Sequence, residues 1–269
     1  MKLRTDIYNY ITNQFSSEKF DCGIILGSGL GYLADDASEK KMISTETIPG
    51  YPKSTVTGHA GRIVSGQLNG KKVLFFQGRI HYYEGYSIKE VVIPILISHA
   101  LGIRKMIITN SAGGLNPNYK PGDLMLIEDH INLMFNNPLI GPVEEGLVRF
   151  PDMSSPYNAE WRDMAKNTAT RLGIFLHEGT YVGMTGPNYE TPHEVKYLRF
   201  IGGDAVGMST VPEVIAARQL NMDVLGISCI SNLAAGLSEK PLSHDEVKET
   251  ADSIKNTFGT LVSSIISEV

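Results

Sequence analysis

Short apolar runs alternate along this chain with longer segments in which apolar residues recur at helical spacing. The runs at 21–26, 105–109 and 223–230 are rich in Ile, Val and Leu and are bounded by polar residues or Gly, as buried strands are. Strands buried on both faces are typical of parallel sheets, whose crossover helices cover them. The alternation therefore predicts an α/β fold with a largely parallel sheet flanked by helices.

Helix boundaries are marked by caps and by proline. Ser87 with Glu90 forms a candidate capping box for a helix that reaches Leu101, and Pro94 is expected to kink that helix. Further boundaries are predicted by Gly173 after 159–172, by Thr191-Pro192 with Glu194, by Val211-Pro212, and by Ser243 with Glu246 before a C-terminal helix. That last helix carries an apolar stripe of Val247, Ala251, Ile254, Phe258, Leu261 and Ile265.

One pair of predicted strands is antiparallel. Segments 62–68 and 71–76 flank Asn69-Gly70, the dipeptide most typical of a two-residue type I′ hairpin. The predicted sheet is therefore mixed.

Length and composition indicate one globular unit. The 269 residues contain no linker, repeat or low-complexity run, and 42% of them are hydrophobic, which suffices for a sizeable core. We therefore expect a single domain spanning residues 1–269. Cys22 and Cys229 lie inside apolar, strand-like runs, which favours buried thiols over a disulfide or a metal site.

Charge and targeting signals argue against several classes of protein. The formal net charge is −5 and Lys and Arg form no stripe, so the electrostatic footprint of a nucleic-acid polymer as partner is missing. The N-terminus has no apolar signal segment, and no apolar run approaches the roughly 18 residues of a membrane span. These features predict a cytoplasmic protein with no membrane partner.

A glycine loop follows the first predicted strand. Ser28 lies in Gly27-Ser-Gly-Leu-Gly31, where small residues let backbone N–H groups approach an anion and leave a hydroxyl to donate. A dinucleotide fingerprint would need Gly where Tyr32 stands, and no Gly-Lys-Ser/Thr follows as in a Walker A loop. The loop therefore favours phosphate. Arg79 and His81, two residues apart beyond a strand, project to the same side in extended geometry and could converge on one oxyanion.

An acid and an amide follow in later loops. Glu190 lies in Gly186-Pro-Asn-Tyr-Glu-Thr-Pro192, and Asn232 follows Ser231 at the end of the last predicted strand. A 6-oxopurine offers N1–H as donor and O6 and N7 as acceptors, which a carboxylate and a carboxamide match. Taken singly, a loop Glu or Asn is more often a solvated or turn residue.

From Gly27 to Val247 the chain resembles the trimeric purine nucleoside phosphorylase family. The resemblance rests on a series of motifs in the family's order: Gly27-Ser-Gly-Leu-Gly, Gly58-His-Ala-Gly, Gln77-Gly-Arg-Ile-His-Tyr-Tyr-Glu-Gly-Tyr, Thr109-Asn-Ser-Ala-Gly-Gly-Leu, Gly179-Thr-Tyr-Val, the segments with Glu190 and Asn232, and Asp204-Ala-Val-Gly-Met-Ser-Thr-Val-Pro-Glu. It implies that the sheet curls into a distorted barrel with helices around it, the nucleoside phosphorylase fold.

The resemblance also implies three groups of site residues. Phosphate would be bound by Ser28, His59, Arg79, His81, Ser111 and Ser209. The ribose would lie against Tyr83, Met208, His244 and Phe150, the last inserted by a neighbouring subunit. The purine would be held by Tyr189, Glu190, Val206 and Asn232, and catalysis would rest on Asn232, Glu190 and His81. For His59, a purely structural hydrogen-bonding role is the alternative.

The implied activity is reversible phosphorolysis of inosine, guanosine and their 2′-deoxy forms to free purine and α-(deoxy)ribose 1-phosphate. The resemblance implies a homotrimer with phosphate as co-substrate, no cofactor and no metal. One alternative is an enzyme like methylthioadenosine phosphorylase, whose 6-aminopurine pocket uses Asp where Asn232 stands. Another is a catalytically silent nucleoside-binding protein, because a fold alone does not guarantee activity.

Overall fold

The computed structural model describes residues 3–56, 60–237 and 244–269, with 244–248 as backbone only. The elements in chain order are α1 (Thr5–Phe15), β1 (Cys22–Leu26), η1 (Gly31–Ala34), β2 (Ser38–Ser44), η2 (Thr45–Thr47), β3 (Arg62–Leu68), β4 (Lys71–Gln77), η3 (Tyr82–Glu84), α2 (Ile88–Val91), α3 (Ile93–Ala100), β5 (Lys105–Gly114), β6 (Leu124–Asn132), α4 (Ala159–Leu172), β7 (Leu176–Gly183), α5 (Pro192–Phe200), β8 (Ala205–Gly207), α6 (Val211–Gln219), β9 (Asp223–Leu233), α7 (His244–Ser253) and α8 (Lys255–Ser267).

The strands form one mixed sheet in the order β2-β3-β4-β1-β5-β8-β7-β6-β9, and β5 also pairs with β9. That extra pairing closes β5, β8, β7, β6 and β9 into a ring, with β1, β4, β3 and β2 extending from it. The helix-flanked barrel is therefore confirmed. The pairs β1–β4, β1–β5, β5–β9, β6–β7 and β7–β8 are parallel.

Antiparallel pairing goes beyond the predicted hairpin. The hairpin itself is confirmed: Leu68 pairs with Lys71, and Asn69 and Gly70 have φ of 50° and 79°, as a type I′ turn requires. The pairs β2–β3, β5–β8 and β6–β9 are antiparallel as well. Strand β2 was not expected because its sequence, SEKKMIS, is charged and mostly exposed, as suits the edge of a sheet.

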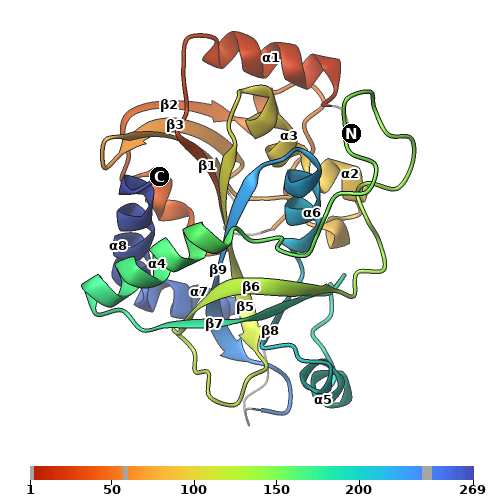
Figure 1. Ribbon diagram of the computed structural model, residues 1–269, viewed down its shortest axis with the longest axis vertical. Coiled ribbons are helices and arrows are strands. Elements are labelled where there is room, and N and C mark those ends of the chain that lie inside the picture. The colour runs from red at the N-terminus through yellow and green to blue at the C-terminus, as the bar shows by residue number, and fades with distance from the viewer. Residues whose placement is uncertain (1–2, 57–59, 238–243) are drawn as a thin grey trace.

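Two hydrophobic layers cover the two faces of the central strands (Figure 1). Along β1, Ile25 packs in the layer with helices α1, α3 and α6, whereas Ile24 and Leu26 pack in the layer with α4 and α8. In β4, Phe76 and Phe75 divide in the same way. This alternation of side chains explains why β1 is buried at every position and why its sequence is continuously apolar.

The helix caps confirm most of the predicted boundaries. Ser87 and Glu90 form a capping box, and the predicted kink is a break at Val92 between α2 and α3, because Pro94 has no N–H to offer the preceding turn. Helix α4 ends at Gly173 with φ of 66°, and Thr191 caps α5.

The C-terminal helix is two helices rather than one. Ile254, with φ of −101° and ψ of 4°, separates α7 from α8. No local sequence signal marks this break. The predicted cap by Ser243 and Glu246 lies outside the described residues.

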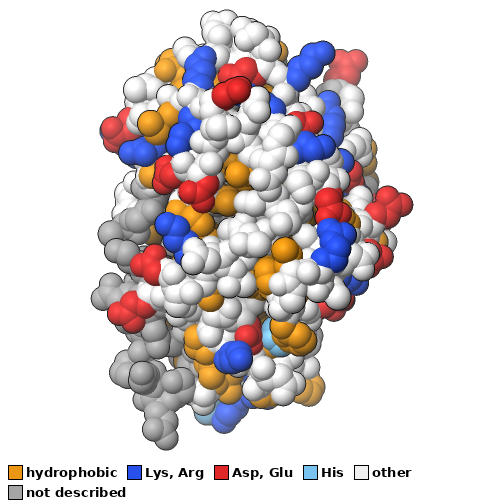
Figure 2. All heavy atoms as spheres, turned by 90° about the vertical axis from the view of Figure 1, so that its left-hand side faces the viewer, with side chains coloured by type: hydrophobic (Ala, Val, Ile, Leu, Met, Phe, Trp, Pro, Cys, Tyr) orange, Lys and Arg blue, Asp and Glu red, His pale blue; other side chains and the backbone are white. Residues whose placement is uncertain are grey.

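The surface in Figure 2 carries interspersed charges, and neither sign gathers into a stripe on that face. Cys22 and Cys229 are fully buried, as predicted, and burial raises the pKa of both thiols to about 12. Among the described residues, no helix combines the length and the apolar character needed to cross a membrane. The cytoplasmic location stays a prediction.

Candidate active site

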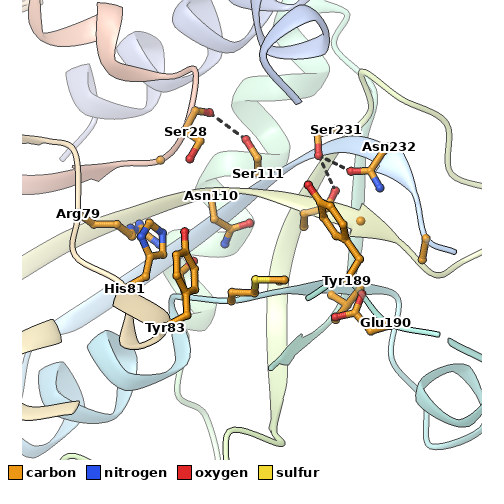
Figure 3. A pocket seen from close by; sticks show the side chains of 18 residues that line it. Ser28, Arg79, His81, Tyr83, Asn110, Ser111, Tyr189, Glu190, Ser231 and Asn232 are labelled. Atoms are coloured by element: carbon orange, nitrogen blue, oxygen red, sulfur yellow. Dashed lines mark hydrogen bonds between the residues drawn. The ribbon is translucent and has the colours of Figure 1, made fainter. Parts of the chain in front are cut away.

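An open cavity lies where the carboxyl ends of the parallel strands β4, β1, β5 and β9 meet, the usual place for a ligand in such a sheet. It encloses about 750 Å³, mouth included. Its walls are formed by Gly27, Ser28, Arg79, His81, Tyr83, Asn110, Ser111, Ala112, Gly113, Tyr189, Glu190, Val206, Gly207, Met208, Ser209, Ser231, Asn232 and Ala234. Figure 3 shows Arg79 and His81 toward one end and Glu190 and Asn232 toward the other.

The glycine loop after β1 lies tightly against β5. A Cβ on Gly27 would come within 2.7 Å of the Cα of Asn110, so only glycine fits. The N–H of Gly27 donates to Thr109 Oγ1 at 3.1 Å, and Ser111 Oγ donates to the carbonyl oxygen of Ser28 at 2.9 Å. These contacts hold the loop and the end of β5 together at the cavity wall.

Arg79 is held rigidly at the wall, with only 3% of its surface exposed. One terminal nitrogen donates to the carbonyl oxygen of Thr109 at 2.6 Å, and the other to Thr210 Oγ1 at 3.3 Å. Its Nε lies 3.6 Å from Oε1 of the fully buried Glu213. The buried carboxylate compensates the cost of burying the cation, and the guanidinium has one defined position.

His81 is oriented by Glu84. The Nδ1 of His81 lies 3.2 Å from Glu84 Oε1, which also accepts from the His81 backbone N–H. Burial alone would raise the pKa of Glu84, but hydrogen bonds from His81 and Thr55 outweigh it and hold the pKa at about 2. Because an ionised carboxylate only accepts, Nδ1 carries the proton. Burial and the charge of Arg79 lower the pKa of His81 against the opposing effect of Glu84, which favours the neutral ring.

Tyr83 stacks on His81, with ring centroids 4.7 Å apart and planes 13° from parallel. Burial, with a smaller contribution from Glu84, raises the pKa of the phenol to about 12, so the hydroxyl remains protonated at neutral pH. The pair forms a flat wall beside Arg79 (Figure 3).

Glu190 is buried at the opposite end, with 8% exposed. Burial raises its pKa, its own backbone N–H opposes the shift, and Glu194 adds a smaller rise. Within the described part of the chain, no side chain donates a hydrogen bond to this carboxylate. A buried acceptor of this kind can be satisfied by a ligand N–H.

Asn232 is fixed by its neighbours. Its Oδ1 accepts from Ser231 Oγ at 2.8 Å, and its Nδ2 donates to the carbonyl oxygen of Leu233 at 3.1 Å. One Nδ2 hydrogen is left for a ligand. Thus one end of the cavity offers cationic and hydroxyl donors, and the other offers one acceptor and one donor.

Eleven of the residues predicted from the sequence line this one cavity: Ser28, Arg79, His81, Tyr83, Ser111, Tyr189, Glu190, Val206, Met208, Ser209 and Asn232. Phe150 does not, and it is 86% exposed. His59 and the side chain of His244 lie outside the described residues. The structure adds small lining residues such as Ala112 and Gly207, and it adds supporting residues behind the wall, Glu84, Thr210 and Glu213, which stand in the quoted motifs without any signal of their roles.

Over the described ranges, no three His, Cys, Asp or Glu side chains come together in a way that could hold a metal ion. The absence of a cofactor stays a prediction.

Comparison with known proteins identifies the family. A sequence model of the phosphorylase superfamily matches residues 21–267, so the chain belongs to that superfamily. Purine nucleoside phosphorylase 1 of Geobacillus stearothermophilus is 54% identical over 258 residues, covering 94% of each chain. Purine nucleoside phosphorylase 1 of Bacillus subtilis (strain 168) is 53% identical over 247 residues, covering 91% of each.

More distant relatives are also purine nucleoside phosphorylases. The Mus musculus purine nucleoside phosphorylase is 44% identical over 254 residues, covering 91% of this chain and 88% of the mouse chain. Two crystal structures of Schistosoma mansoni purine nucleoside phosphorylase, in complex with adenosine and with inosine, superpose with TM-scores of 0.92 and 0.91 at 38% and 37% identity. Each comparison covers 98% of this chain and 95% of the other.

Proposed function

We propose that this protein catalyses the reversible phosphorolysis of 6-oxopurine nucleosides, inosine and guanosine and their deoxy forms, to free purine and α-(deoxy)ribose 1-phosphate. One observation carries the proposal: a single cavity joins the donors of Arg79 and the hydroxyls at one end to the Glu190 and Asn232 pair at the other. The purine nucleoside phosphorylases among the relatives support the same reaction.

Phosphate is the proposed co-substrate. The fixed guanidinium of Arg79, with the hydroxyls of Ser28 and Ser209 and the backbone N–H of Ser111, would hold the anion by charge-assisted hydrogen bonds. Neutral His81, whose Nδ1 proton is directed at Glu84, would present Nε2 to a protonated phosphate oxygen. Bound phosphate would then stabilise the sugar cation and attack C1′ as the bond from C1′ to N9 breaks.

The purine would leave at the opposite end. Glu190 would accept the N1–H, and the remaining Nδ2 hydrogen of Asn232 would donate to O6 or to N7. In the transition state the departing base gains negative charge, so a positioned donor and protonation at N7 lower the barrier. Val206 and Tyr189 would pack against the ring, and Tyr83, Met208 and His244 would lie along the ribose.

A homotrimer belongs to the same proposal. Phe150 and Phe135 are 86% and 91% exposed in one chain, and exposed aromatic side chains are typical of contacts between subunits. Phe150 would complete the sugar pocket of a neighbouring subunit.

A 6-aminopurine substrate is the second candidate, since the Schistosoma mansoni enzyme has been crystallised in complex with adenosine. A pocket of this kind therefore admits adenosine, but Asn232 and ionised Glu190 suit the 6-oxo pattern better than its reverse. A silent binding protein is disfavoured by the assembled set of Arg79, His81, Glu190 and Asn232.

The deciding test is to incubate the protein with inosine, guanosine and adenosine, each with and without phosphate, and to follow free base. The proposal expects phosphate-dependent release from the first two. In Arg79→Ala the phosphate KM should rise on the order of 100-fold while the inosine KM changes little. Arg171→Ala, a change at an exposed arginine, is the control. Equal release without phosphate would indicate a hydrolase.

A further inference from the structure

Thr210 has a backbone conformation that threonine rarely adopts. Its φ is 72° and its ψ is −54°, and the N–H of Val211 donates to the carbonyl oxygen of Ser209 at 2.8 Å. This is a γ-turn of the positive-φ type, which is uncommon and strained even for residues without a branched Cβ. Strained conformations persist where the surrounding structure fixes them, and they cluster at functional sites.

The side chain of Thr210 connects three residues of the cavity wall. Its Oγ1 lies 2.8 Å from Asn110 Nδ2, 3.3 Å from a terminal nitrogen of Arg79, and 3.2 Å from Ser209 Oγ. Thr210 itself is fully buried and does not line the cavity, whereas Asn110, Arg79 and Ser209 all do. Any effect of Thr210 on a ligand must therefore pass through these three.

Counting donors and acceptors fixes the direction of the hydrogen bonds. The guanidinium and the amide nitrogen can only donate, so they occupy the two lone pairs of Thr210 Oγ1. The single hydroxyl proton of Thr210 is then directed to Ser209 Oγ. Ser209 therefore accepts from Thr210, and its own proton points away from Thr210, toward the Tyr181 hydroxyl beside it or toward a ligand in the cavity.

We propose that Thr210 is a positioning residue for the anion: it makes Ser209 a donor and holds Arg79 and Asn110 in place around the phosphate. The γ-turn brings this about, because it lets consecutive residues 209 and 210 present their hydroxyls to each other. This inference rests on the proposed phosphate site, and it adds a residue that never touches the phosphate.

The test compares Thr210→Val, which keeps the shape but removes the hydroxyl, with Thr210→Ser, which restores it. Thr210→Ala is measured alongside, because it removes the same hydroxyl with less crowding. Thr168→Val is the matched control. Thr168 is also buried and its hydroxyl also donates a hydrogen bond, but the acceptor is Glu268, and neither residue lines the cavity. The readouts are the phosphate KM, the inosine KM, and the Kd of inorganic phosphate alone by calorimetry.

We expect Thr210→Val and Thr210→Ala to raise the phosphate KM and Kd about tenfold or more, the usual scale for loss of a hydrogen bond to a charged group, here the Arg79 guanidinium. The inosine KM should change less than about twofold, and Thr210→Ser should recover most of the phosphate affinity. Because Thr210 acts partly through Ser209, Ser209→Ala should cost less phosphate affinity when added to Thr210→Val than when made in the wild type. Unchanged phosphate affinity, equal losses for phosphate and inosine, or fully multiplicative losses in the double variant would overturn the inference.

The Kd arm separates this inference from the proposed function. If the wild type binds phosphate but does not turn over nucleosides, the proposed function is wrong. The ratio of phosphate Kd values between the variants and the wild type still tests the role of Thr210. If turnover requires phosphate and the Thr210 variants match the wild type, only the inference on Thr210 fails.

Discussion

Ser231 holds the carboxamide oxygen of Asn232. The Ser231 hydroxyl lies 2.8 Å from Oδ1 of Asn232, and the Leu233 carbonyl oxygen accepts from Nδ2 at 3.1 Å. Because a carbonyl oxygen cannot donate, the amide has one favoured orientation, in which a nitrogen rather than an oxygen is available to the ligand.

Ser231→Ala should therefore weaken the choice of base. Without the hydroxyl only the Leu233 carbonyl oxygen holds the amide, so its orientation is less strongly fixed and we expect the ratio of kcat/KM for inosine to that for adenosine to fall about five- to tenfold, the usual effect of one hydrogen bond. Ser231→Thr keeps the donor and should keep the ratio. An unchanged ratio in the alanine variant would show that Asn232 is held by other contacts.

Asn232→Asp should shift the preference further. Inosine presents O6 as an acceptor, whereas adenosine presents a 6-amino donor, and a carboxylate accepts where the amide donates. We expect inosine kcat/KM to fall and the inosine-to-adenosine ratio to drop on the order of 100-fold, since a mismatched charged group is costly. Steady-state kinetics on both nucleosides check this, and a ratio that stays put would mean that Asn232 does not recognise position 6.

Glu190 should cost the unliganded protein stability at neutral pH. Burial raises its pKa, so the folded protein holds this proton more tightly than the unfolded chain does. The stabilisation that comes from this more tightly held proton is complete below the ordinary Glu pKa of about 4.3, and it is lost as the pH rises through the raised pKa of Glu190.

Glu190→Gln should therefore raise the Tm at pH 7 by about 2 °C or more and leave it nearly unchanged below about pH 4. The same change should lower kcat/KM for inosine, because the N1–H loses an ionised acceptor. Thermal melts across pH, with Glu145→Gln at an exposed glutamate as the control, measure the effect. A lower Tm of Glu190→Gln at pH 7, or a change in Tm that is the same at every pH, would argue against a desolvated carboxylate at this position.

Phe150→Ala should impair nucleoside binding without unfolding the chain. The side chain is 86% exposed and lies outside the cavity of its own subunit, so truncation leaves no void in the core. If it completes a neighbour's sugar pocket, the inosine KM should rise about tenfold with the phosphate KM unaffected. Phe175→Ala, at another exposed Phe, is the control. A fully active monomer in light scattering would contradict the assembly.

Local chemistry made much of this fold predictable. The Ser87 and Thr191 caps and the Asn69-Gly70 turn act within a few residues, and the structure has them where the sequence indicated. The closure of the barrel through β5, β6 and β9 depends on pairing between distant segments, which no local signal specifies.

The site, too, has residues that the sequence predicts and residues that it does not. Residues with reactive or charged side chains in loops, such as Arg79 and Glu190, could be singled out, and motif resemblance gave them partners. The supporting residues behind the cavity wall could not be singled out from the sequence. The role of Thr210 depends on a turn conformation that threonine seldom adopts and on a buried position beside Asn110. The residue type alone predicts neither the turn conformation nor the buried position.

The fate of the sugar tests the proposed phosphorolysis most directly. Incubating the protein with inosine and phosphate, and quantifying hypoxanthine by absorbance and phosphorus species by ³¹P NMR, should give one ribose 1-phosphate for each hypoxanthine, with no release when phosphate is omitted. Free ribose in place of ribose 1-phosphate, at a rate that does not depend on phosphate, would contradict it.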